Sequence, residues 1–196
     1  MSAISHDHKA IFVHIPKNAG ISISRSLEMP VTGHGTLSQL LRGKPAPEGY
    51  YTFSVVRNPW DRLVAAYLYM KEGGRGGKQD RRLQQILANH RTFQHFLADL
   101  DGLLPVMNAA CPHFLPQIHF HDYRINYVGH FERLEGDFAY ICKTLGIERE
   151  LRKDNMTEQN HYTTYYKSDE EIRKVGVIYD IDCRIYGYRY DIRIPL

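Results

Sequence analysis

Two short segments carry cationic side chains in settings that suit the binding of an anionic group. Lys17 lies in HIPKNAGISIS (residues 14–24), and Arg57 lies in SVVRNPWDRLVAAY (residues 54–67). In the first segment, Gly20 permits close backbone approach, and the N–H groups that open a helix can donate to phosphate or sulfate oxygens. In the second, the planar fork of the arginine matches a phosphate in two hydrogen bonds. The chemistry these segments predict is anion binding.

Each segment begins within an apolar run that predicts a buried strand. The runs are AIFVHI (10–15) and YTFSVV (51–56), and both are short and rich in β-branched or aromatic residues. After the second run, Asn58 and Pro59 favour the start of a helix. Strands that alternate with helices predict a parallel sheet covered by helices, whose ligands bind at the carboxyl ends of the strands. Two cationic sites at adjacent strand ends suggest a nucleoside with phosphates at both ends.

The remaining elements follow from helical and alternating patterns along the chain. A helix is expected to run from Asn58 to just before Gly73, and another to start near Ser168 and continue toward GYRY. Residues 105–117 hold three prolines and are expected to form a loop, and IHFHD a short extended piece. Other expected elements are helices at 79–89, 92–100 and 134–145 and a strand at 127–131. We expect one domain over residues 1–196.

Composition restricts the class of protein further. The chain has 196 residues, of which 43% are hydrophobic and 24% charged, as expected for a globular domain. A formal charge of +3 is too small to indicate a nucleic-acid partner. No apolar run approaches the ~18 residues of a membrane span, and the N-terminus lacks a secretory signal. Three widely spaced cysteines fit a reducing compartment, so we expect a cytoplasmic location without membrane attachment.

The two segments resemble motifs of the sulfotransferases. The first is similar to their loop H-x-P-K-T-[AG]-[GS]-T-S, and the second to F-V-R-[ND]-P-x-[DE]-R-L-V-S-A-Y. The pattern is most like carbohydrate sulfotransferases of the heparan-sulfate 2-O and chondroitin type and their short bacterial counterparts. The resemblance continues through HFLPQIHF, YVGHFERLEGDFAYICKTLGI and YYKSDEEI. It implies an α/β, P-loop-NTPase-like three-layer fold with a central parallel sheet flanked by helices.

The resemblance also implies a donor, 3′-phosphoadenosine 5′-phosphosulfate (PAPS). Arg57 would hold the 3′-phosphate. The loop that would hold the 5′-phosphosulfate consists of Lys17, Asn18, Ala19, Gly20, Ile21 and Ser22. The chain departs from the family pattern at Asn18 and Ile21, where threonine is usual, and at Ala65, where serine is usual. Each lost neutral hydrogen bond would weaken donor binding by about 0.5–1.5 kcal/mol.

Sulfuryl transfer needs a cation at the leaving oxygen and a base at the acceptor hydroxyl. Lys17 would stabilise the charge that grows on the bridging oxygen. His34 is our first candidate for the base, because glycines flank it and because a histidine near this place looks catalytic in the 2-O-sulfotransferase pattern. His113 is the second candidate. The expected acceptor is a hydroxyl of a carbohydrate or of another molecule, and the oligomeric state is open.

Alternative functions make different demands on the sequence. A small P-loop-like kinase needs a Walker A segment, and G-x-x-x-x-G-K-[ST] is absent. A degenerate, non-catalytic nucleotide-binding module would be consistent with Ile21 and Ala65. A metal site is not expected, since the candidate ligands lack paired spacing; they are Cys111, His113, His119, His121 and Asp122. Arg62 is interpreted as part of a surface ion pair, and the tyrosines of 162–166 as core residues ahead of the last helix.

Overall fold

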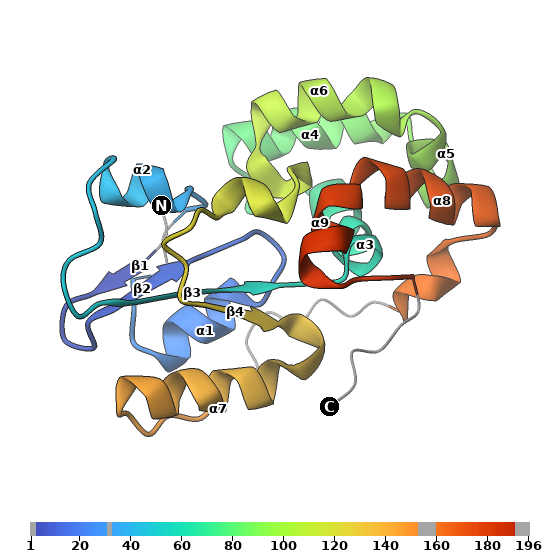
Figure 1. Cartoon of the computed structure of the whole chain (residues 1–196). Helices are drawn as coiled ribbons and strands as arrows, with labels where there is room; N and C mark the ends of the chain where they lie inside the picture. Colours follow the sequence, from blue (N-terminus) through green and yellow to red (C-terminus); the bar gives the residue numbers. More distant parts are fainter. Residues whose placement is uncertain (1–2, 31–32, 153–159, 191–196) are drawn as a thin grey trace. The chain divides into compact units, whose positions relative to one another are not determined.

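The computed structural model describes residues 3–30, 33–152 and 160–190 (Figure 1). Its contacts divide the chain into two compact units, which we describe separately. The first unit comprises Met1–Arg57, Gln117–Met156 and Arg193–Leu196, and the second comprises Asn58–Pro116 and Thr157–Ile192. A single domain over residues 1–196 stays a prediction.

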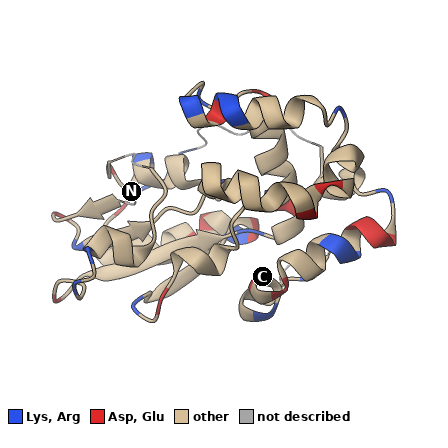
Figure 2. Cartoon of the chain, turned by 90° about the horizontal axis from the view of Figure 1, so that it is seen from above, with Lys and Arg blue, Asp and Glu red and all other residues tan. Residues whose placement is uncertain are grey.

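The first unit is built on a four-stranded sheet with the strand order β1-β2-β3-β4. Strands β2 (Ala10–Val13), β3 (Tyr51–Val56) and β4 (Tyr127–His130) are parallel, with Phe12 opposite Phe53 and Phe53 opposite Tyr127. Among the residues that the structure describes, the strands contain no Lys, Arg, Asp or Glu (Figure 2). The predicted α/β fold with a central parallel sheet and flanking helices is confirmed. The antiparallel edge strand β1 (Ala3–Ser5) was not predicted, because three residues carry too little pattern.

One face of this sheet carries the core of the first unit. Ala10, Phe12, Phe53 and Val55 alternate along β2 and β3 and so share that face. Helices α1 (Gly20–Ser26) and α7 (Leu134–Leu145) pack on it and lie on the same side of the sheet in Figure 1. Their contacting side chains are Ile23, Leu27, Phe138, Ile141 and Cys142. Helix α2 (Leu37–Leu41) lies on the other side (Figure 1).

The second unit is helical and packs around α3 (Pro59–Lys71). As predicted, Asn58 caps this helix: its side chain accepts a hydrogen bond from Trp60 N at 3.0 Å, and Pro59 occupies the first turn. Trp60, Leu63 and Tyr67 carry the apolar face into the core. The other helices are α4 (Lys78–Ala88), α5 (Phe93–Ala98), α6 (Leu100–Ala110), α8 (Asp169–Ile178) and α9 (Asp180–Tyr186), with the 3-10 turns η1 (Pro112–Phe114) and η4 (Tyr162–Tyr165).

Three local predictions were wrong. Residues 105–110 belong to α6 despite Pro105, because Leu100 and Met107 of that helix are buried in the core and packing can outweigh propensity. The segment IHFHD does not form a strand; its first residues lie in a 3-10 turn, η2 (Gln117–Phe120). The last helix is broken at Tyr179. The side chain of Tyr179 is buried, and its hydroxyl donates a hydrogen bond to Phe114 O at 2.9 Å.

Within the described parts of the chain, we find no helix whose length and apolar character would let it cross a membrane.

Candidate active site

The loop between β2 and α1 has an alternating backbone that suits an anion. Lys17 (φ 69°) and Ala19 (φ 57°) are both left-handed, whereas Asn18 between them is not. Such alternation turns successive N–H groups toward one side and forms a concave anion-binding site. Left-handed residues other than glycine cost on the order of 1–3 kcal/mol each and cluster at functional sites. The strain therefore supports a binding role for the loop.

Gly20 closes this loop, and the ring of His14 explains why it is a glycine. A Cβ atom on Gly20 would lie 1.8 Å from Cδ2 and 1.9 Å from Nε2 of His14. The His14 ring stacks on Phe12, with 5.8 Å between the ring centroids, and meets the ring of His34 edge-on at 4.4 Å. Because Gly20 has no side chain, the buried ring of His14 can pack against the first residue of α1.

His34 reaches the same strand end through its own hydrogen bond. Its Nδ1 lies 3.2 Å from the carbonyl oxygen of His14. A carbonyl only accepts, so Nδ1 must carry a hydrogen, and in the neutral imidazole the lone pair is then on Nε2. The structure therefore brings the candidate base, in the tautomer a base requires, next to the end of β2.

Arg57 joins the second motif to the first. It is buried, with 8% of its surface exposed, and its Nη1 donates to the carbonyl oxygen of Lys17 at 3.0 Å. The guanidinium also lies over the ring of Phe131, 4.0 Å from the centroid, in cation–π geometry. Phe131 follows β4, so the ends of all three parallel strands contribute to this arrangement.

The buried side chain of Asn18 attaches the loop to neighbouring parts of the first unit by hydrogen bonds. Its side chain is 1% exposed, and its Nδ2 donates to Val55 O at 2.8 Å and to Gln117 Oε1 at 2.8 Å. The backbone of Asn18, rather than its side chain, is therefore the part that suits an anionic ligand. Among the other predicted loop residues, Lys17, Ala19 and Ile21 are partly exposed, and Gly20 and Ser22 are buried.

A polar pair joins buried Ser54 of β3, close in sequence to Arg57, to half-buried His121, which follows η2. Ser54 Oγ is hydrogen-bonded to Nε2 of His121, and burial lowers the pKa of His121 to about 4. The imidazole is thus neutral near pH 7 and adds no positive charge.

Asp137 of α7 organises the end of β4. Its carboxylate accepts hydrogen bonds from the Tyr127 hydroxyl at 3.0 Å, from the His130 backbone N–H at 2.5 Å and from Arg133 Nε at 3.2 Å. Burial and the hydrogen bond to this carboxylate raise the pKa of Tyr127 to about 12. The strand end next to Phe131 is therefore held in one geometry.

Arg62 has a different role from the one its sequence predicts. The side chain is 2% exposed, and it donates to Leu115 O at 2.9 Å and to His113 O at 3.1 Å. The interpretation as a surface ion pair is wrong, because the fold buries this face of α3. The guanidinium instead donates to carbonyl oxygens of η1 and of the residue that follows it. His113, the second candidate base, stacks on Tyr69, with 5.5 Å between centroids. It belongs to the second unit, as does Ala65, which is buried on α3.

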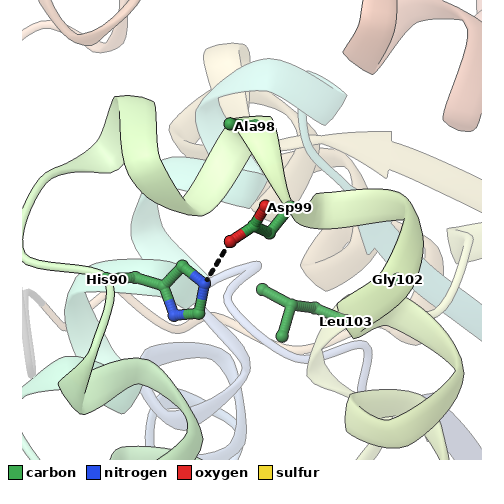
Figure 3. A pocket seen from close by; sticks show the side chains of 5 residues that line it. All are labelled: His90, Ala98, Asp99, Gly102 and Leu103. Atoms are coloured by element: carbon green, nitrogen blue, oxygen red, sulfur yellow. Dashed lines mark hydrogen bonds and ion pairs between the residues drawn. The ribbon is translucent and has the colours of Figure 1, made fainter.

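Two surface hollows of the structure are lined by residues other than the predicted donor-site residues. One of about 490 Å³ in the second unit is lined by His90, Ala98, Asp99, Gly102 and Leu103, and in it His90 Nε2 is 3.1 Å from Asp99 Oδ2 (Figure 3). This hollow pairs its histidine with a carboxylate and holds no Lys or Arg, so its lining does not suit an anionic donor. Over the residues that the structure describes, no group of three or more His, Cys, Asp or Glu side chains is arranged to hold a metal ion.

These observations define an α/β protein in which a loop with two left-handed residues and a buried arginine lie at neighbouring strand ends. The sulfotransferase family model matches residues 2–189, and the chain belongs to this family, which has a P-loop-like fold. An uncharacterized protein of Archaeoglobus fulgidus is 27% identical over 109 residues, which cover 56% of this chain and 78% of the relative. No solved structure matches the chain significantly. Membership of the family supports sulfuryl transfer as the general activity of this chain.

Proposed function

We propose that this sulfotransferase moves the sulfuryl group of PAPS to an acceptor hydroxyl, that of a carbohydrate. The observation that carries the proposal is the hydrogen bond from Arg57 Nη1 to Lys17 O. It brings together two cationic motifs that are 40 residues apart in sequence. One nucleotide with anionic groups at both ends could then engage both motifs.

In this proposal the loop and the arginine divide the donor between them. The backbone N–H groups of residues 17–22, with the Lys17 ammonium, hold the 5′-phosphosulfate. Arg57 holds the 3′-phosphate, and a guanidinium has five N–H donors, so it can do this while Nη1 stays on the loop. The stacking on Phe131 fixes the plane of the guanidinium, which favours bidentate recognition of a phosphate.

The proposed chemistry uses Lys17 and His34. The bond between the sulfur and the bridging phosphate oxygen breaks, and a bond between the sulfur and the acceptor oxygen forms. The ammonium of Lys17 stabilises the negative charge on the departing oxygen, which is larger in the transition state than in the ground state. The acceptor proton passes to Nε2 of His34, the nitrogen that its hydrogen bond to His14 O leaves with a lone pair.

The cysteines support a reducing compartment, for which the cytoplasm is our proposal. Cys111, Cys142 and Cys183 are all free thiols. A protein made in an oxidising compartment would more often pair such residues.

Binding of the product nucleotide tests the proposal most directly. We expect adenosine 3′,5′-bisphosphate to raise the melting temperature and to bind in calorimetry, and ATP·Mg²⁺ to do neither. Lack of binding up to millimolar bisphosphate would refute the donor assignment, and binding of ATP·Mg²⁺ alone would indicate a kinase. For the acceptor, transfer of radiolabelled sulfate from PAPS to oligosaccharides is expected, and transfer only to phenols would contradict the carbohydrate assignment.

A further inference from the structure

Gln117, to which the motifs assign no role, lies at the centre of the contacts that join the lysine loop to Arg57. It is the first residue of η2, and its side chain is fully buried. Its Oε1 accepts from Asn18 Nδ2 at 2.8 Å and from the Arg57 backbone N–H at 2.9 Å. Its Nε2 donates to the Arg57 carbonyl oxygen at 2.8 Å. One side chain therefore holds both sides of the candidate donor site.

The contact with Arg57 resembles the pairing of a further strand residue. The described register of β3 with β4 ends at Val56 opposite His130, so Arg57 is the next residue along the chain. There the side-chain amide of Gln117 pairs with both the N–H and the C=O of the main chain. Each partner fixes the orientation of the amide, since its oxygen faces donors and its nitrogen faces a carbonyl. A buried amide held in this way is a rigid support.

We infer that Gln117 is a positioning residue of the donor site, which sets the place from which the Arg57 guanidinium binds the nucleotide. The inference rests on the proposed function. The backbone of Arg57 is fixed by Gln117, and the guanidinium then meets Lys17 O and the ring of Phe131. Gln117 thus acts on the ligand chiefly through Arg57, and its bond with Asn18 adds a smaller effect through the lysine loop.

A double-mutant cycle on nucleotide affinity tests this role. The variant Gln117→Met has an unbranched side chain of similar length and removes all three hydrogen bonds. We expect it to weaken bisphosphate binding about tenfold, because the Arg57 guanidinium is then no longer held in position for the nucleotide. In an Arg57→Ala background, most of this loss should disappear, since the group that Gln117 positions is then absent. An equal loss in both backgrounds would overturn the inference.

A second variant and a matched control guard against a simple loss of folding. Gln117→Glu keeps the acceptor bonds at one oxygen and places the other oxygen against the Arg57 carbonyl, so it should also weaken binding in a manner that depends on Arg57. Gln94→Met removes another glutamine bond to the main chain, from Nε2 to Tyr165 O at 2.5 Å, in the unit without the donor residues. It should lower the unfolding free energy and leave bisphosphate affinity unchanged.

The outcomes separate this inference from the proposed function. If the unaltered protein does not bind the bisphosphate, the proposed function fails, and the inference fails with it. If the protein binds it and Arg57→Ala weakens binding, but neither Gln117 variant does, only the positioning role of Gln117 is refuted.

Discussion

The contact between Gly20 and His14 gives a sharp test of how the loop is built. In Gly20→Ala, the new methyl would lie 1.8 Å from His14 Cδ2 and 1.9 Å from Nε2. Carbon atoms in contact are about 3.5–4.0 Å apart, so the ring must retreat by roughly 2 Å or leave its place. Overpacking of this kind costs about 1–3 kcal/mol. Gly20 is the first residue of α1, where the higher helix propensity of alanine offsets less than the ~1 kcal/mol of a helix interior, so most of this loss remains.

Urea denaturation of a double-mutant cycle measures this coupling. His14→Ala removes the ring and makes room for the methyl, although it is itself destabilising through the loss of the contacts with Phe12 and His34. In that background, Gly20→Ala should be neutral or slightly stabilising, with a coupling free energy of about 1–3 kcal/mol. If Gly20→Ala is as stable as the parent, or is equally destabilising in both backgrounds, the steric explanation for Gly20 is wrong.

The remaining predictions concern catalysis and pH. Lys17→Ala should lower kcat, because it removes about 3 kcal/mol of transition-state stabilisation, and it should change bisphosphate affinity little. Arg57→Ala should mainly weaken that affinity. If both variants lose only affinity, Lys17 is not catalytic. His34→Ala should reduce turnover by about 10²–10⁴-fold, and unchanged turnover in steady-state assays would remove it as the base. Burial lowers the pKa of His121 to about 4, so the unfolded chain takes up a proton that the folded one excludes as pH falls from about 6.5 to about 4. The unfolding free energy should therefore fall over that range, by at most on the order of 3 kcal/mol, and His121 should contribute no pH dependence above it. In His121→Gln, this fall in unfolding free energy should be absent. A pH slope in urea titrations that the substitution leaves unchanged would contradict the assignment.

The positions of Lys17, Arg57 and the three parallel strands could be predicted because they depend on local pattern. Short apolar runs define β2, β3 and β4, and the capping residues Asn58 and Pro59 define the start of α3. Parallel strands place their carboxyl ends at one edge of a sheet. Proximity of the two cationic segments therefore followed from the order of the elements alone.

Other features depended on contacts between residues distant in sequence. Arg62 looked like a surface residue, yet it is buried and binds carbonyl groups about 50 positions away. Pro105 suggested a loop, but Leu100 and Met107 carry α6 into the core. Local composition cannot report such effects, because the stabilising partner is brought close only by the fold.

The sequence by itself thus indicated that this chain belongs among the sulfotransferases, and it predicted which cations would meet an anionic donor. Only the tertiary structure decided how these cations are held. In the structure, Arg57 donates to the Lys17 carbonyl oxygen, and the His14 ring packs against Gly20. Gln117 forms hydrogen bonds with residues of both motifs. The physical reason is that motifs specify which groups bind, whereas the buried hydrogen bonds that orient them join residues 40 to 99 positions apart.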